Sequence, residues 1–141
     1  MPVRFAVPED AAALIRLNAA FNGPGMEDIR YVERSLRENP NEIVCIAELD
    51  GEPAGFCCAQ LVSSFCYKEK SGEITELYVE PHARRKGLAT ALMQLAEREL
   101  IARGASSLKL LTSDDNFDAR AFYESLGYAL DGEVHYAKDG E

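Results

Sequence analysis

Three segments that follow one another between residues 72 and 104 limit most strongly how this chain can fold. Residues 74–79 are mostly β-branched, aromatic or apolar, and they stop before Pro81, which cannot donate a hydrogen bond to a neighbouring strand. Further on, apolar residues recur at spacings of three and four over 89–100, and Gly104 follows where a helix commonly ends. The sequence therefore predicts a strand, a tight turn and an amphipathic helix in succession.

The turn between strand and helix contains Arg84, Arg85, Lys86 and Gly87. At the start of a helix the first backbone N–H groups have no partner inside the helix, and the helix dipole makes this end positive. Together with the cationic side chains, such a turn is suited to bind a phosphate or pyrophosphate group. The alternative is a solvated basic turn before an ordinary amphipathic helix, and the turn alone is compatible with both.

Length and charge narrow the class of protein. A chain of 141 residues, 47% of them hydrophobic, can bury a core, and we expect residues 1–141 to form a single domain. The net charge of −9 argues against nucleic-acid binding as the main role, because contacts to phosphates need a basic surface. This charge favours a cationic small molecule or a basic peptide as the partner.

The cysteines do not have the pattern of a metal site, because no CxxC spacing and no nearby histidine accompany them. We expect Cys45, Cys57, Cys58 and Cys66 to be reduced and mostly buried packing residues, with no bound metal. No apolar run approaches the roughly 20 residues of a membrane span, and the N-terminus lacks the core of a signal peptide. These patterns predict a cytoplasmic protein without a membrane partner.

Helix and strand patterns predict an α+β chain with the element order βααβββαβαββ. Because the central strand is followed by a crossover helix and another strand, we expect the two halves of the sheet to splay around it. The predicted segments are strand 3–6, a helix from 8–10 to 22–25, helix 27–37, a hairpin of 43–49 and 53–62 with its turn at 50–51, strand 73–79, a helix ending at 103, strand 108–112, helix 117–126 closed by Gly127, and a final hairpin of 128–130 and 134–137.

Two motifs resemble those of the GNAT-type N-acetyltransferase family. The pattern Arg84-x-x-Gly87-x-Ala89 is similar to that family's pyrophosphate motif for acetyl-CoA, which is Arg or Gln, two residues, Gly, one residue, and Gly or Ala. Asn116 followed by residues 121–128 resembles its second acetyl-CoA motif. The resemblance covers nearly the whole chain and implies the GNAT fold, a mixed central sheet of about six or seven strands flanked by about four helices.

The resemblance also implies that acetyl-CoA is the co-substrate. The backbone N–H groups of residues 85–90 would bind its pyrophosphate, and the strand residues before Pro81 would pair with its pantetheine arm and donate to the thioester carbonyl. Asn116 matches a position that often contacts the cofactor arm. The full set of expected cofactor-binding residues is Leu77, Tyr78, Val79, Arg84, Arg85, Lys86, Gly87, Leu88, Ala89, Thr90, Asn116, Ala119, Phe122 and Tyr123.

The same family similarity implies direct acetyl transfer to an amine, which must lose a proton before it attacks. We favour Glu73 as the base, with Glu76 as the alternative, and Tyr123 matches the position of the acid that protonates the CoA thiolate. In an unbroken strand the two glutamates would point to opposite faces, being three residues apart, so at most one would line a given cleft. Family members often have a bulge on this strand, which would change that expectation.

Other titratable residues are expected to serve the structure. His82 and His135 are predicted to have surface or structural roles, and Asp114 and Asp115 are predicted to be helix caps rather than a metal pair.

The acceptor cannot be identified from a motif. In this fold the loops 22–27 and 63–71 would border the acceptor cleft, and their acidic and aromatic residues suggest a cationic amine. Candidates are a polyamine, an aminoglycoside-like compound, or a lysine or N-terminal amine of a peptide. The alternative function is a non-catalytic, regulatory acyl-CoA-binding domain. GNAT-like domains often pair through their C-terminal strands, so a homodimer is possible.

Overall fold

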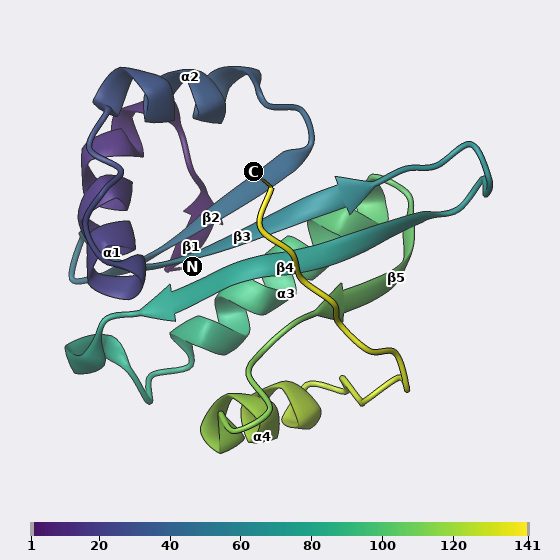
Figure 1. The fold of residues 1–141 in the computed structure, drawn as a ribbon. Coiled ribbons are helices and arrows are strands. Elements are labelled where there is room, and N and C mark those ends of the chain that lie inside the picture. The colour runs from purple at the N-terminus through teal and green to yellow at the C-terminus, as the bar shows by residue number, and fades with distance from the viewer. Residues whose placement is uncertain (1, 141) are drawn as a thin grey trace. The chain divides into compact units, whose positions relative to one another are not determined.

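The computed structural model describes residues 2–140 and divides into two compact units. The first unit ends at Leu111 and the second begins at Thr112. The first holds the β-sheet with helices α1 to α3, and the second holds helix α4 (Figure 1). The expectation that residues 1–141 form a single domain stays a prediction.

The first unit follows the predicted order of elements. Its elements are β1 (Val3–Phe5), a 3₁₀ turn (Pro8–Asp10), α1 (Ala11–Asn22), α2 (Ile29–Glu38), β2 (Glu42–Leu49), β3 (Glu52–Val62), β4 (Lys70–Val79), a second 3₁₀ turn (Pro81–Ala83), α3 (Leu88–Ala102) and β5 (Ala105–Leu110). The strands lie in the order β1-β2-β3-β4-β5, with antiparallel pairs as far as β4. β5 is parallel to β4 and follows it through the crossover helix α3.

The β2–β3 hairpin forms where the sequence predicts it. Asp50 and Gly51 both have positive φ, 54° and 81°, which is the backbone of the tight turns that match the twist of paired strands. This turn sets the pairing of β2 with β3.

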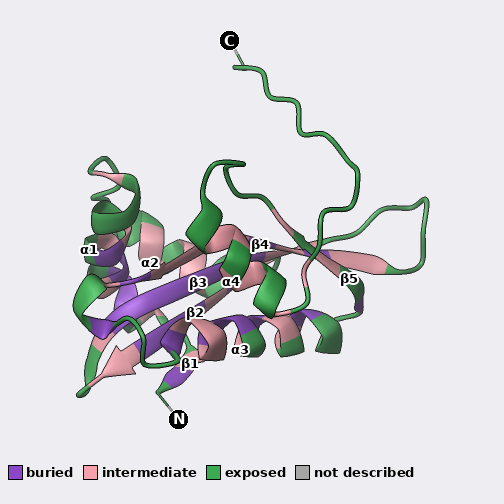
Figure 2. Cartoon of the chain, turned by 90° about the horizontal axis from the view of Figure 1, so that it is seen from below, coloured by how far each residue is buried: buried purple, intermediate pink, exposed green. Residues whose placement is uncertain are grey.

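The core fills both faces of the sheet (Figure 2). On one face α3 packs with Leu92, Met93 and Leu100, which are fully buried. On the other face Leu14 and Leu17 of α1 join a buried cluster with strand residues that include Phe56 and Cys58. Figure 2 shows α3 on one side of the sheet, α1 and α2 on the other, and a largely buried β3 between them.

Gly72 allows α3 to lie close to β4. A Cβ atom at this position would come within 2.7 Å of a methyl group of Leu100, too close for two carbon atoms. The absence of a side chain therefore lets the crossover helix pack directly on β4.

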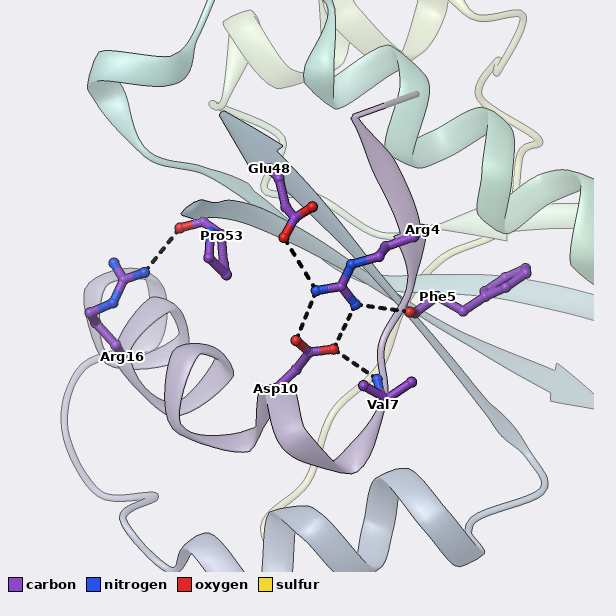
Figure 3. Close-up of polar contacts among 7 residues, drawn as sticks. All are labelled: Arg4, Phe5, Val7, Asp10, Arg16, Glu48 and Pro53. Atoms are coloured by element: carbon purple, nitrogen blue, oxygen red, sulfur yellow. Dashed lines mark hydrogen bonds and ion pairs between the residues drawn. The ribbon is translucent and has the colours of Figure 1, made fainter. Parts of the chain in front are cut away.

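A partly buried ion pair joins the start of the chain to the sheet (Figure 3). Arg4 donates hydrogen bonds of 2.8 and 2.9 Å to the carboxylate of Asp10, and it also lies 3.4 Å from Glu48. The Asp10 carboxylate accepts a further bond of 2.8 Å from the backbone N–H of Val7. The Arg4 hydrogen bonds lower the pKa of Asp10, so this carboxylate is held as the anion that fastens β1, the 3₁₀ turn and β2.

Within its described residues, 112–140, the second unit contains one regular element, α4 (Phe117–Ser125). The side chain of Asn116 caps its start, since its Oδ1 accepts from the N–H of Ala119 at 3.2 Å. Gly127, with φ of 98°, and the bond from the Tyr128 N–H to the Tyr123 carbonyl end the helix as predicted. The prediction that Asp114 and Asp115 cap this helix was wrong, because Asn116 is the N-cap residue.

Two further expectations are corrected. The hairpin of 128–130 and 134–137 does not form, so the described sheet has five strands rather than six or seven. Leu130, Val134 and Tyr136 are 72–89% exposed, so they bury no apolar face, and a lone two-stranded hairpin has little stability in water. β5 begins three residues earlier than expected, because Gly104 ends the helix and the chain enters the sheet at once at Ala105.

None of the helices between residues 2 and 140 is long and apolar enough to cross a membrane.

Candidate functional site

The basic turn before α3 has the backbone of an anion-binding site. Arg85 and Gly87 have positive φ values of 63° and 81°, and α3 begins directly afterwards at Leu88. The first N–H groups of α3 have no partner inside the helix, and a Cβ on Gly87 would meet nothing within 4 Å. The backbone here is thus open to a ligand, and the role of residues 85–90 in binding a pyrophosphate stays a prediction.

Arg84 fastens the turn to the end of β4. Its Nε donates to the carbonyl oxygen of Val79 at 2.8 Å, and its guanidinium lies 5.9 Å from the ring centre of Tyr78. Tyr78 packs in turn against Phe21, with ring centres 5.3 Å apart. One of the expected charge donors therefore also has a structural role.

Arg84, Arg85 and Lys86 are all exposed, and none of them forms an ion pair with a described carboxylate. Arg84 differs in that its guanidinium is held by the Val79 carbonyl and lies near the Tyr78 ring. Just before the turn, Glu80 is paired with Arg16 of α1 and lies 3.3 Å from His82. All three cations beside the open backbone therefore keep their charge, and no hydrogen bond or ion pair with a described residue fixes the side chains of Arg85 and Lys86.

The edge of β4 next to this turn lacks a neighbouring strand. β5 pairs with β4 only from Lys70 to Ile74, whereas β3 pairs with β4 as far as Val79. Within the described chain the segment 75–79 therefore has a strand on one side only. This agrees with the predicted splay, and it leaves backbone groups at the positions of Leu77, Tyr78 and Val79 to which an extended ligand could bind.

A β-bulge changes the faces of the two candidate bases. Ile74 and Glu76 of β4 pair with adjacent residues of β3, so Thr75 is the extra residue. Glu73 pairs with Gln60 and Glu76 with Cys58, and cross-strand partners share a face of the sheet. Both glutamates consequently point to the face covered by α1 and α2, unlike in an unbroken strand.

The two glutamates nevertheless have different surroundings. The Glu73 carboxylate lies 3.9 Å from the ammonium nitrogen of Lys109 on β5. The Glu76 carboxylate accepts a bond of 3.3 Å from the Thr75 hydroxyl and lines a cavity between the sheet, α1 and α2. Glu73 does not line that cavity.

This cavity has a volume of about 400 Å³. Its walls are mixed, with apolar residues such as Leu14 of α1, Phe56 of β3 and Met26 of the α1–α2 loop beside polar ones. The polar residues include Asn18, Tyr31, Ser35, Asn39 and Gln60. The predicted border along 63–71 does not contribute to it, whereas the predicted loop 22–27 does. A cavity of this size that combines apolar walls with converging polar groups is a common form of small-molecule site.

Two polar residues of this cavity were missed by the sequence analysis. Glu42 of β2 and Cys58 of β3 lie beside Glu76, and the ligand atoms of the three side chains are all within 4.8 Å of one another. Burial, and then the charge of Glu76, raises the pKa of Glu42. Burial also raises the pKa of the Cys58 thiol, with both carboxylates adding to the effect. No local pattern marks Glu42, because its role depends on strand register.

The remaining predicted site residues lie on or next to α4. The Tyr123 ring lies 5.4 Å from that of Phe122 and 6.2 Å from that of Tyr128, centre to centre. Asn116 and Ala119 form the capping hydrogen bond described above. His135 is exposed in the segment after this helix.

Comparisons with known proteins agree with this geometry. The model of the Acetyltransferase (GNAT) family matches residues 12–128. The N-acetyltransferase YhfO of Bacillus subtilis (strain 168) is 34% identical over 142 residues, covering 96% of this chain and 95% of that protein. The structure of the aminoglycoside acetyltransferase HMB0005, from an uncultured soil metagenomic sample, has a TM-score of 0.84 at 27% identity and covers 99% of this chain and 97% of that one. The ribosomal-protein-alanine N-acetyltransferase of Brucella melitensis biovar Abortus 2308 shares the fold, with a TM-score of 0.81 at 23% identity over 99% and 100% of the two chains.

Proposed function

The chain belongs to the acetyltransferase (GNAT) family, and we propose that it transfers an acetyl group from acetyl-CoA directly to a primary amine of a cationic small molecule or peptide. The observation that carries this proposal is the open, basic turn at the start of α3 beside the unpaired edge of β4. A pyrophosphate and an extended amide-containing arm are the two chemical parts that such a pair of features can bind.

In this proposal the pyrophosphate of acetyl-CoA binds to the backbone N–H groups of 85–90. Arg85 and Lys86 add positive charge, while Arg84 holds the turn against Val79. The pantetheine amides pair with the backbone of 77–79, which directs the thioester along β4.

The reaction needs a base, a donor to the developing oxyanion and a proton for the departing thiolate. The lone pair of the neutral amine attacks the thioester carbon and the C–S bond breaks. The nitrogen releases a second proton as the amide forms, and the departing thiolate takes up one proton, so CoA leaves as the thiol. We assign the base to Glu76 in preference to Glu73, because Glu76 lines the cavity and Glu73 lies near Lys109. Backbone N–H near Val79 would donate to the carbonyl oxygen, and Tyr123 would protonate the thiolate.

A cationic acceptor is supported by the chemistry of the cavity and of the whole chain. Glu42 and Glu76 line the cavity, and the net charge is −9. The relative HMB0005, which is 27% identical, is an aminoglycoside acetyltransferase. Aminoglycosides carry several amines, most of which are cationic at neutral pH.

The experiment is a calorimetric titration of the full chain with acetyl-CoA, followed by a thiol-release assay over a panel of amines. The panel should contain a polyamine, an aminoglycoside, a lysine peptide and an acidic amino acid. Binding with release of CoA in the presence of cationic amines is the expected result. Turnover of acidic amino acids alone would contradict the acceptor class. Binding without turnover of any amine would favour a regulatory acyl-CoA-binding domain.

A further inference from the structure

We propose that Glu42 and Glu76 together bind the ammonium group of the acceptor at the sheet side of the cavity, so that the acceptor is an amine attached to an apolar body. This inference deepens the proposed function and rests on it in one respect: the bound amine is an acetyl acceptor only if the proposed reaction takes place. It assigns a role to Glu42, which belongs to neither predicted motif.

The two carboxylates come from strands that are not neighbours. Glu42 is on β2 and Glu76 is on β4, with Cys58 of β3 between them. The bulge at Thr75 turns Glu76 toward the face on which Glu42 lies, and the ligand atoms of the three residues are within 4.8 Å of one another. A single ammonium nitrogen can reach both carboxylates at this spacing.

The cavity contains no charge that would neutralise this pair. Among the described residues that line it, none is lysine, arginine or histidine. Glu42 has one weak contact, 3.4 Å from the Gln60 amide, and Glu76 has the Thr75 hydroxyl at 3.3 Å. Two carboxylates at this distance in a partly buried site repel each other, so a cation that enters is stabilised by both.

The rest of the cavity indicates what the cation is attached to. Leu14, Met26 and Phe56 give it apolar walls, and the volume of about 400 Å³ suits a small molecule or one side chain of a peptide. The Cys58 thiol is nine-tenths buried at the carboxylate end, and no described residue forms a hydrogen bond with it. An ammonium N–H directed at the carboxylates would lie against this thiol.

A metal ion is the competing ligand, because two carboxylates and a thiol could also hold zinc. Zinc binds the thiolate form of cysteine. Burial and the two carboxylates raise the pKa of the Cys58 thiol well above its ordinary value. The thiol is therefore neutral when the cavity is empty, and the two carboxylates are left as hydrogen-bond acceptors, which suits an ammonium group.

The pair also accounts for the proton that the acceptor must lose. One carboxylate takes one proton from the bound ammonium, which leaves a neutral amine and a carboxylic acid, and the other carboxylate keeps its charge. The amine then attacks the thioester as described above. After CoA and the amide leave, the carboxylic acid returns its proton to water.

The test is calorimetric titration of the full chain, without acetyl-CoA, with 2-phenylethylamine and with its neutral analogue 2-phenylethanol. Near neutral pH the amine should bind at least about tenfold more tightly than the alcohol, since only the amine is charged. Glu42→Gln should weaken amine binding at least about fivefold and leave alcohol binding nearly unchanged. Glu42→Asp, which keeps the charge, should restore part of the affinity.

Glu52→Gln is the matched control. Glu52 is exposed at the start of β3 and does not line the cavity, yet its substitution changes the net charge equally. This variant should bind the amine like the unmodified protein. Thermal unfolding of each variant checks that the fold is retained.

Equal affinity for amine and alcohol would overturn the proposal, as would amine binding that Glu42→Gln leaves unchanged, or no amine binding up to about 20 mM. Stoichiometric binding of Zn²⁺ that requires Glu42, Cys58 and Glu76, without amine binding, would assign the cluster to a metal instead. Titration of the same preparation with acetyl-CoA separates the two claims. If the amine binds and acetyl-CoA does not, the proposed function fails and the ammonium site stands.

Discussion

The basic turn and the acidic cavity are two candidate binding regions of opposite charge, and they are built differently. The turn uses consecutive residues, 84–90, and offers exposed cations with open backbone N–H groups. The cavity takes its carboxylates from β2 and β4 and covers them with residues of α1 and α2. The first would attract the anionic end of acetyl-CoA, and the second would attract a cationic amine.

The two sites differ in how much they depend on strand register. Residues that are contiguous keep their spacing in any strand register. A slip of one residue between β3 and β4 would turn Glu76 to the opposite face and separate it from Glu42. The bulge at Thr75 is therefore as important for the cavity as the glutamates themselves.

The largest expected effect in this comparison of turn and cavity is that of Glu76→Gln, which changes the cavity alone. If Glu76 is the base, the variant should lower kcat by about 10²-fold or more while acetyl-CoA affinity stays within about twofold. Glu73→Gln should change kcat only a few-fold, because Glu73 does not line the cavity. Steady-state kinetics with a pH–rate profile, together with calorimetry, checks both. Equal and small effects of the two substitutions would point to a base formed by ordered water.

The turn is tested by Gly87→Asp against Gly87→Asn. Both side chains have nearly the same size, and both tolerate the left-handed backbone at φ of 81° better than most residues. The aspartate places negative charge against the phosphates, so we expect its Kd for acetyl-CoA to be at least about tenfold higher than that of the asparagine variant. Binding of 2-phenylethylamine should be the same in both. Tight acetyl-CoA binding by Gly87→Asp would exclude the turn as the pyrophosphate site.

The role of the second unit is tested by Tyr123→Phe. Because the substitution removes a proton donor and little contact area, kcat should fall about tenfold while the affinity for acetyl-CoA stays nearly unchanged. Ser125→Ala on the same helix serves as a control for loss of a hydroxyl group. Unchanged turnover by Tyr123→Phe would reject the acid role.

The smallest expected effect is on stability. Because the pKa of Glu42 is raised in the folded state, that state binds its proton more readily than the unfolded chain does. The free energy of unfolding should therefore fall as pH rises above about 4.5, and Glu42→Gln should remove this fall.

We compare the free energy of unfolding of Glu42→Gln with that of the unmodified protein at pH 5 and at pH 8. The difference should change in favour of the variant by no more than about 1 kcal/mol, because the site is partly solvated. Denaturant unfolding at the two pH values measures the difference. The titratable groups that line the cavity together with Glu42 are Glu76, Cys58 and Tyr31. The control Glu52→Gln should show no such change in relative stability. A free energy of unfolding that falls with pH more steeply in Glu42→Gln than in the unmodified protein would contradict the prediction and indicate that the charged form of Glu42 stabilises the fold.

Much of the fold was predictable because its signals are local. The Asp50-Gly51 turn, the Asn116 region and the periodicity of α3 each depend on a few adjacent residues. The final hairpin at 128–137 was predicted wrongly from the same kind of signal. Alternating apolar residues form a strand only when a face of the sheet buries them, and Val134 and Tyr136 remain exposed.

The sequence by itself determined the basic turn, because an anion site at a helix start needs only adjacent backbone groups and cations. It also determined the candidate glutamates of β4. Only the tertiary structure decided that Glu73 and Glu76 share a face and that Glu42 lies beside Glu76. The physical reason is that strand register and bulges arise from hydrogen bonding between strands distant in the chain, which no local pattern of residues specifies.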